Sequence, residues 1–162
     1  MIRFFVTILF LCVSSIECNL ENFAKVSVDN KVFYVSREKV TFLAALRNCQ
    51  EHGLVPATVD SYTENKALLS SGCLAAASGQ TTTGTYLWLG YLKIQNVVHN
   101  LNTLLVPTYT NFEPGQPDKW EEFCVEMECS DGEWHDNYCD RKYNYVCQEP
   151  GKGTELPSES TG

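Results

Sequence analysis

The chain has 162 residues, eight cysteines and a formal net charge of −8 at pH 7. This length suits one globular domain. An acidic chain without a basic cluster is a poor partner for nucleic acid, heparin or an anionic membrane, so we expect no nucleic acid among its ligands.

The first 18 residues have the pattern of a secretory signal peptide. A short basic start, Met1–Arg3, precedes the apolar run 4–13, and Ser14 and Ser15 follow. This run is too short to span a bilayer, and cleavage after Ser15 or after Cys18 fits the pattern equally. We therefore predict a signal peptide over 1–18 and a secreted, extracellular protein that does not insert into a membrane.

The next part of the chain predicts an early strand and two helices. The β-branched and aromatic segment 31–36 is typical of a strand. Thr41 opens a helix that Gly53 stops, with one apolar face. The segment Ser61-Tyr62-Thr63-Glu64 matches a capping box, which predicts a second helix ended by Gly72.

The later part predicts short strands and one long loop. We expect strands at 86–91, 123–128, 133–136 and 143–147. The stretch 92–118 has weak periodicity, and a loop of this length inside a domain is usually functional. The fold class is therefore α+β. The tail 150–162 has no apolar face and is expected to be disordered.

Six cysteines remain if Cys12 and Cys18 leave with the signal peptide. They are Cys49, Cys73, Cys124, Cys129, Cys139 and Cys147. An even number in an exported chain predicts disulfides. Zinc is the rival use, but the sequence contains no Cys-x-x-Cys or His-x-x-x-His pair.

Polar residues that could bind a cation gather in the second half. Gln116-Pro117-Asp118 is followed by Trp120 and by Glu122, which stands two residues before a cysteine. Trp134-His135-Asp136 stands three residues before another. Carboxylate and amide oxygens beside a long loop are what calcium requires. If the bond before Pro117 is cis, the side chains on either side of it point the same way.

The order of four segments resembles the C-type lectin domain family. These segments are YLWLGY, GQPDKWEEFCVEM, DGEWHDNYC and YVC, and the resemblance runs from about 31 to 148 within a predicted domain over 19–149. It implies two helices packed on short antiparallel sheets, with a long loop that binds calcium and sugar. It also implies the disulfides Cys49–Cys147 and Cys124–Cys139.

Two cysteines fall outside the pattern that the family shares. By elimination we expect Cys73 to pair with Cys129, which would tie the end of the second helix to the strand hairpin. The alternative is that one of them pairs with a retained Cys18 or with another chain.

The resemblance also assigns the binding site. It implies one calcium ion held by Gln116, Asp118, Glu122, His135 and Asp136. The same residues and Trp120 would contact the sugar. In this family the order Gln-Pro-Asp goes with galactose and N-acetylgalactosamine rather than mannose. An indole is a natural platform for the apolar face of galactose, which is the expected role of Trp120.

The chain departs from the family at three points. His135 stands where the family has Asn, and histidine is a poor ligand for a hard cation, so we expect weak calcium binding that weakens further below neutral pH. The glycine-rich loop that normally follows the Gln-Pro-Asp motif is missing, which leaves Trp120 less firmly placed. The segment LKIQNVVHN offers no carboxylate for an accessory calcium.

We expect a binding protein rather than an enzyme. A His-Asp pair near a cysteine is a weak signal for a secreted phospholipase, and a glycosidase needs two opposed carboxylates that sequence alone does not place. The main alternative is a lectin-like module that binds protein, with weak or no calcium and sugar binding. The resemblance to single-domain invertebrate lectins implies glycan partners and a role in innate immune recognition. Agglutination would require a homo-oligomer.

Overall fold

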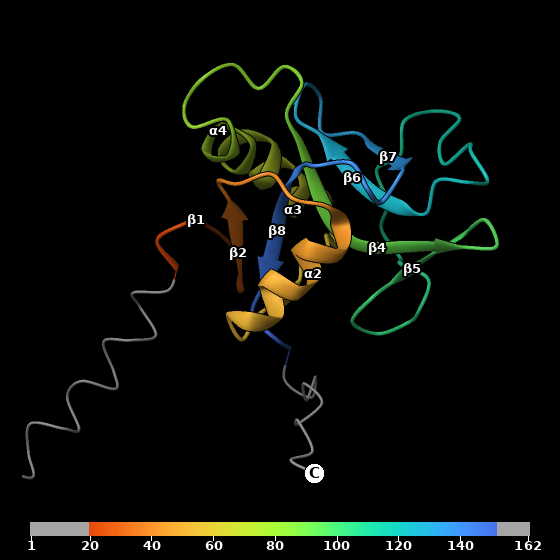
Figure 1. Cartoon of the computed structure of the whole chain (residues 1–162), viewed down its shortest axis with the longest axis horizontal. Coiled ribbons are helices and arrows are strands. Elements are labelled where there is room, and N and C mark those ends of the chain that lie inside the picture. The colour runs from red at the N-terminus through yellow and green to blue at the C-terminus, as the bar shows by residue number, and fades with distance from the viewer. Residues whose placement is uncertain (1–19, 152–162) are drawn as a thin grey trace, which may run out of the picture.

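The computed structural model describes residues 20–151, where helical segments pack on a mixed β-sheet (Figure 1). The predicted signal peptide lies outside the described residues, and so do residues 152–162 of the predicted tail. Among the residues described, no helix is long and apolar enough to cross a membrane. The α+β class predicted from the sequence is confirmed.

The two helices begin where their capping residues predict. In α2 (Phe42–Glu51) the Thr41 hydroxyl accepts a hydrogen bond from the Ala44 backbone N–H at 3.4 Å. In α3 (Tyr62–Ala67) the Ser61 hydroxyl accepts from the Glu64 N–H at 3.2 Å. Each hydroxyl satisfies one of the free N–H groups of a first helical turn.

The second helix is longer than predicted. It continues from α3 through a π-helical turn, η2 (Leu68–Gly72), into α4 (Cys73–Ala76). A Cβ on Gly72 would lie 3.1 Å from Leu68 Cδ2 and 3.3 Å from Val35 Cγ2. Gly72 therefore lets the helix pack closely on the sheet, and the prediction that it ends the helix is wrong.

One sheet holds all the strands of the described residues. Its order is β1-β2-β8-β4-β6-β7, with β3 added to β8 and β5 added to β4. The resemblance implied antiparallel pairs only, but β4 and β8 run parallel. The strands are β1 (Phe23–Val28), β2 (Lys31–Ser36), β3 (Val55–Pro56), β4 (Tyr86–Ile94), β5 (Val97–Asn100), β6 (Cys124–Glu128), β7 (Trp134–Asn137) and β8 (Asn144–Gln148).

Strands β1 and β5 were not predicted. β5 lies inside the stretch 92–118, and a hairpin joins it to the extended end of β4. Gln95 and Asn96 form its turn with φ of 51° and 63°, the left-handed conformation that a tight hairpin turn needs. The irregular connection is therefore 101–123. This connection and the β4–β5 hairpin lie on the side of the molecule opposite β1 and β2 (Figure 1).

Three disulfides link cysteines within residues 20–151. They are Cys49–Cys147 and Cys124–Cys139, which the family resemblance implied, and Cys73–Cys129, which was expected by elimination. The second joins α4 to the residue after β6, and the third joins the start of β6 to the residues after β7. Both thus anchor the strands that flank the candidate site.

A buried tryptophan fixes the position of β7. Trp134 stacks on Tyr91 with ring centroids 5.2 Å apart, and its Nε1 donates to Asn65 Oδ1 at 2.8 Å. The Asn65 amide in turn donates to the Gly132 carbonyl at 3.0 Å. Because buried polar groups are costly without partners, this chain of bonds sets both the depth and the register of β7.

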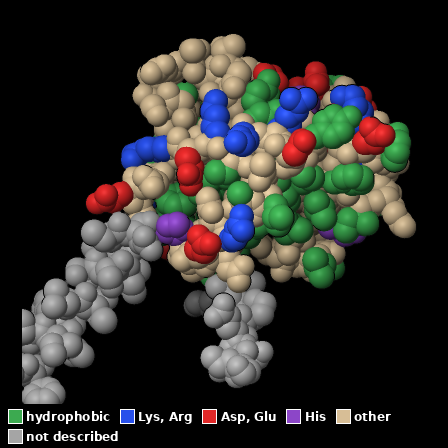
Figure 2. Space-filling model, viewed as in Figure 1, with side chains coloured by type: hydrophobic (Ala, Val, Ile, Leu, Met, Phe, Trp, Pro, Cys, Tyr) green, Lys and Arg blue, Asp and Glu red, His purple; other side chains and the backbone are tan. Residues whose placement is uncertain are grey.

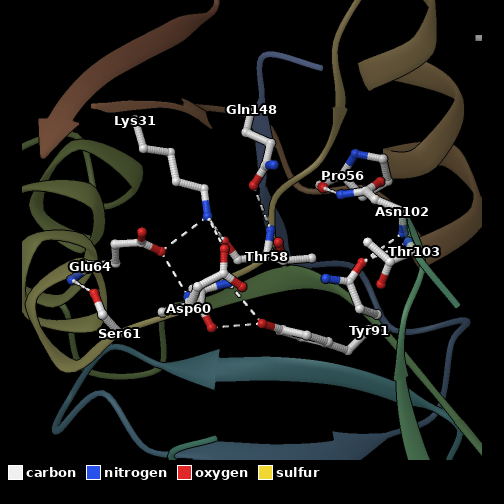
Figure 3. A network of polar contacts seen from close by, with 12 residues as sticks. Lys31, Pro56, Thr58, Asp60, Ser61, Glu64, Tyr91, Asn102, Thr103 and Gln148 are labelled. Carbon is white, nitrogen blue, oxygen red and sulfur yellow. Dashed lines mark hydrogen bonds and ion pairs between the residues drawn. The ribbon is translucent and has the colours of Figure 1, made fainter. Parts of the chain in front are cut away.

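A polar network fixes the segment before α3 (Figure 3). The Lys31 ammonium donates to Asp60 Oδ2 at 2.8 Å and to Glu64 Oε2 at 3.0 Å. The Tyr91 hydroxyl donates to the Val59 carbonyl at 2.8 Å. Strands β2 and β4 are thereby tied to the same segment before α3.

Candidate functional site

Three carboxylates converge where β7 meets the connection 101–123. One oxygen each of Asp118, Glu122 and Asp136 lies within 4.8 Å of the other two. Asp136 and Glu122 are buried, whereas Asp118 is exposed. Like charges held this close repel one another, so the cluster calls for positive charge or hydrogen-bond donors.

Gln116 joins this cluster. The Gln116–Pro117 bond is cis, and the Gln116 side chain lies beside both aspartates. With the amide nitrogen turned toward them, it donates to Asp136 Oδ1 at 2.6 Å and to Asp118 Oδ1 at 3.3 Å. The structure thus brings together four of the five residues expected to hold the cation: Gln116, Asp118, Glu122 and Asp136.

A lysine that sequence analysis did not single out also enters the cluster. The Lys93 ammonium donates to Asp136 Oδ2 and to the Lys119 carbonyl. The Lys93 and Asp136 side chains are only 2% and 0% exposed. The available signal was a lone charge in the apolar run YLWLGYLKI, because lysines are almost never fully buried unless paired.

The oxygen atoms of the cluster are of the type that calcium prefers, but several of them already accept hydrogen bonds from other groups of the chain. Asp136 Oδ1 accepts from the Asp118 backbone N–H at 3.2 Å, and Oδ2 accepts from Lys93. Oxygens of Asp118, Glu122, Asp136 and Gln116 would hold the ion, provided that Lys93 moves and the Gln116 amide turns its oxygen inward. A calcium ion bound there would neutralise the carboxylates and polarise the hydroxyls of a ligand.

His135 points away from this set. Its Nδ1 lies 3.2 Å from Glu126 Oε1, and its Nε2 lies 3.1 Å from Glu113 Oε2. Strand pairing places Glu126 directly across from His135 on β6. Both ring nitrogens therefore face carboxylates outside the three-carboxylate cluster, although the family resemblance implied a ligand role for this residue.

The two glutamates keep His135 charged. The hydrogen bond and the charge of Glu126 raise the pKa of His135 to about 9, with Glu113 adding to the effect and desolvation opposing it. Burial raises the pKa of Glu126. In the absence of a bound cation, these contacts therefore favour the protonated form of His135 at neutral pH.

Trp120 provides an exposed aromatic surface next to the cluster. It is 75% exposed, and with Lys93, Gln95, Asn96 and Phe123 it lines a hollow of about 430 Å³. Hydrophobic side chains gather on this side of the molecule (Figure 2). The exposed ones in the β4–β5 hairpin and the connection are Ile94, Val97, Leu104, Leu105, Val106, Trp120 and Phe123. The site therefore combines a cluster of carboxylates with neighbouring exposed apolar side chains.

Comparison with known sequences finds one family model. Residues 38–149 match the model described as the lectin C-type domain. Collectin-10 of Gallus gallus is 27% identical over 129 residues, which cover 74% of this chain and 42% of collectin-10. E-selectin of Canis lupus familiaris is 29% identical over 123 residues, 71% of this chain and 19% of E-selectin. The chain thus spans less than half the length of these relatives.

Solved structures share the fold. The carbohydrate-recognition domain of the mouse scavenger receptor C-type lectin superposes with a TM-score of 0.66 at 23% identity, covering 80% of this chain and 94% of that domain. The C-type lectin domain of murine dendritic cell inhibitory receptor 2, solved in complex with an N-glycan, gives 0.63 at 17% identity, with 81% and 98% covered. At these identities the likeness shows the fold alone.

Proposed function

The chain belongs to the C-type lectin domain family, and on this premise we propose that it is a carbohydrate-binding lectin for glycans with galactose or N-acetylgalactosamine ends. The observation that carries the proposal is the convergence of Gln116, Asp118, Glu122 and Asp136 beside the exposed Trp120. Such convergent polar groups next to an apolar surface are what a small polar ligand with one apolar face needs.

Sugar selection is assigned to the pair Gln116 and Asp118. A pair of neighbouring hydroxyls can donate to a carboxylate and accept from an amide. The amide comes first and the carboxylate second in this chain, which is the order that the family resemblance associates with galactose. Trp120 would stack on the apolar face of that sugar.

Calcium is the proposed cation, with one site per chain. The ion would be held by oxygens of Asp118, Glu122, Asp136 and Gln116, while His135 stays with its two glutamates. In support, the donor set is made of the hard oxygens that calcium prefers. The proposal extends to a secreted protein that binds and does not catalyse, and that needs oligomers to agglutinate cells in innate immune recognition.

Affinity chromatography tests the proposal. The mature protein is applied to galactose-agarose in calcium, eluted with a chelator, and challenged with free galactose or mannose. We expect retention that calcium supports and that galactose competes better than mannose. Trp120→Ala should weaken galactose binding roughly 2- to 10-fold, the worth of one aromatic contact.

A matched control separates stacking from general loss of aromatic surface. Tyr62 on α3 is 64% exposed, so Tyr62→Ala removes an exposed ring elsewhere and should leave retention unchanged. Absence of retention on galactose, N-acetylgalactosamine and mannose columns would refute sugar binding. It would favour the alternative of a protein-binding module, for which the exposed Leu104, Leu105 and Val106 provide apolar surface.

A further inference from the structure

Lys93 is a buried cation whose position is set by the sheet. It is the eighth residue of β4, and its backbone N–H donates to the Phe123 carbonyl at 2.7 Å. Cys124, the residue after Phe123, forms a disulfide with Cys139. The Lys93 backbone is therefore fixed beside the carboxylate cluster, so the ammonium can leave Asp136 only by movement of the side chain.

The ammonium joins oxygens from two segments of the chain. Asp136 comes from β7, and the Lys119 carbonyl comes from the turn between Asp118 and Glu122. These are the segments that a bound metal ion would have to hold together. Lys93 supplies positive charge and hydrogen bonds at the same place.

Other carboxylate oxygens of the cluster also have hydrogen-bond donors or a cation from within the domain. Asp136 Oδ1 takes the Asp118 N–H at 3.2 Å and the Gln116 amide nitrogen at 2.6 Å. The exposed Lys119 ammonium lies 3.4 Å from Glu122 Oε1. Each member of the cluster thus already has a donor from within the domain.

We propose, building on the proposed function of this site, that Lys93 is an internal cation that competes with calcium for Asp136. Two cations sharing one buried carboxylate repel each other strongly, because little water screens them. Calcium binding must therefore displace the ammonium, which lowers calcium affinity. In the absence of calcium, Lys93 keeps β7 and the turn 118–122 together.

Calorimetric titration of calcium into the chelator-treated mature protein tests this competition. Lys93→Met keeps the apolar stem and removes the charge, so calcium affinity should rise about tenfold or more, as expected for a close buried charge pair. Lys119→Met removes a charge beside the same cluster from an exposed side chain and should change affinity by less. Lys25→Met, on the exposed part of β1, should change nothing.

A second measurement uses the unaltered protein, in case Lys93→Met fails to fold without calcium. Lysine-directed acetylation followed by mass spectrometry compares Lys93 with the exposed Lys119. In chelator Lys93 should be protected, and calcium should raise its labelling while magnesium should not. Stoichiometric calcium binding with Lys93 still protected would overturn the competition.

The outcomes separate this inference from the proposed function. Equal calcium affinity in Lys93→Met and unaltered protein refutes competition, whatever the sugar columns show. Tighter calcium binding by Lys93→Met supports it, even if galactose retention fails. Failure of galactose retention alone counts against the sugar ligand and leaves the role of Lys93 standing.

Discussion

Replacing His135 by glutamine should remove a pH-dependent part of the stability. The pKa of His135 rises from its ordinary value of 6.5 to about 9 in the fold, so folding favours its protonated form. This contribution is fully present below the unfolded pKa of 6.5 and is lost as pH rises through about 9. His135→Gln should therefore cost most at acidic to neutral pH and least at alkaline pH.

The geometry bounds the size of this effect. A shift of this size corresponds to at most about 3 kcal/mol of linkage. The Glu126 side chain is 2% exposed, but Glu113 is half exposed and its attraction is screened by water. We therefore expect the pH-dependent difference between the two proteins to be about 1–2 kcal/mol.

Urea unfolding in chelator measures this difference. The free energy of unfolding is compared between unaltered protein and His135→Gln at roughly pH 6 and at about pH 10, on either side of the two pKa values. His99→Gln on β5, where the ring Nδ1 lies 3.0 Å from the Val97 carbonyl, controls for loss of a histidine. If the free energy of unfolding changes with pH in the same way in unaltered protein and in His135→Gln, the contacts of His135 with Glu126 and Glu113 do not favour its protonated form.

Two further changes test the supports of the site. Trp134→Phe leaves Asn65 Oδ1 buried without its donor at 2.8 Å, so unfolding free energy should fall by about 1–3 kcal/mol in urea titration; an unchanged midpoint would contradict this. The double change Cys73→Ala and Cys129→Ala removes a disulfide that closes a loop between residues 56 positions apart. By the chain-entropy estimate the free energy of unfolding should fall by about 4 kcal/mol, which is measured as a lower thermal midpoint. A loss well below 1 kcal/mol would mean that the other two disulfides already restrain this loop.

The predictable parts of the fold are those set by local chemistry. The strand over Lys31–Ser36 follows from its β-branched and aromatic residues, and both helix starts follow from the hydroxyls of Thr41 and Ser61. The end of the second helix depends instead on what Gly72 touches across the sheet. Close packing between distant segments leaves no local signature.

The same division applies to the site. The family motif identified Gln116, Asp118, Glu122 and Asp136, and the structure brings all four together. Lys93 was missed because its inward direction depends on the pairing of β4 with β6 and on the hairpin at Gln95–Asn96. The neighbours of His135 depend equally on the register of β6 against β7.

The connection 101–123 begins and ends at fixed points. The Leu101 N–H donates to the Gly90 carbonyl at 2.9 Å, and Cys124 is closed by its disulfide. Loops anchored in this way tolerate insertion and replacement at little cost to the scaffold. Of the residues that face the proposed ligand, Gln116, Asp118, Trp120 and Glu122 all belong to this segment. The domain is therefore a natural acceptor for loop grafting, in which ligand preference is exchanged by transplanting one continuous stretch of chain.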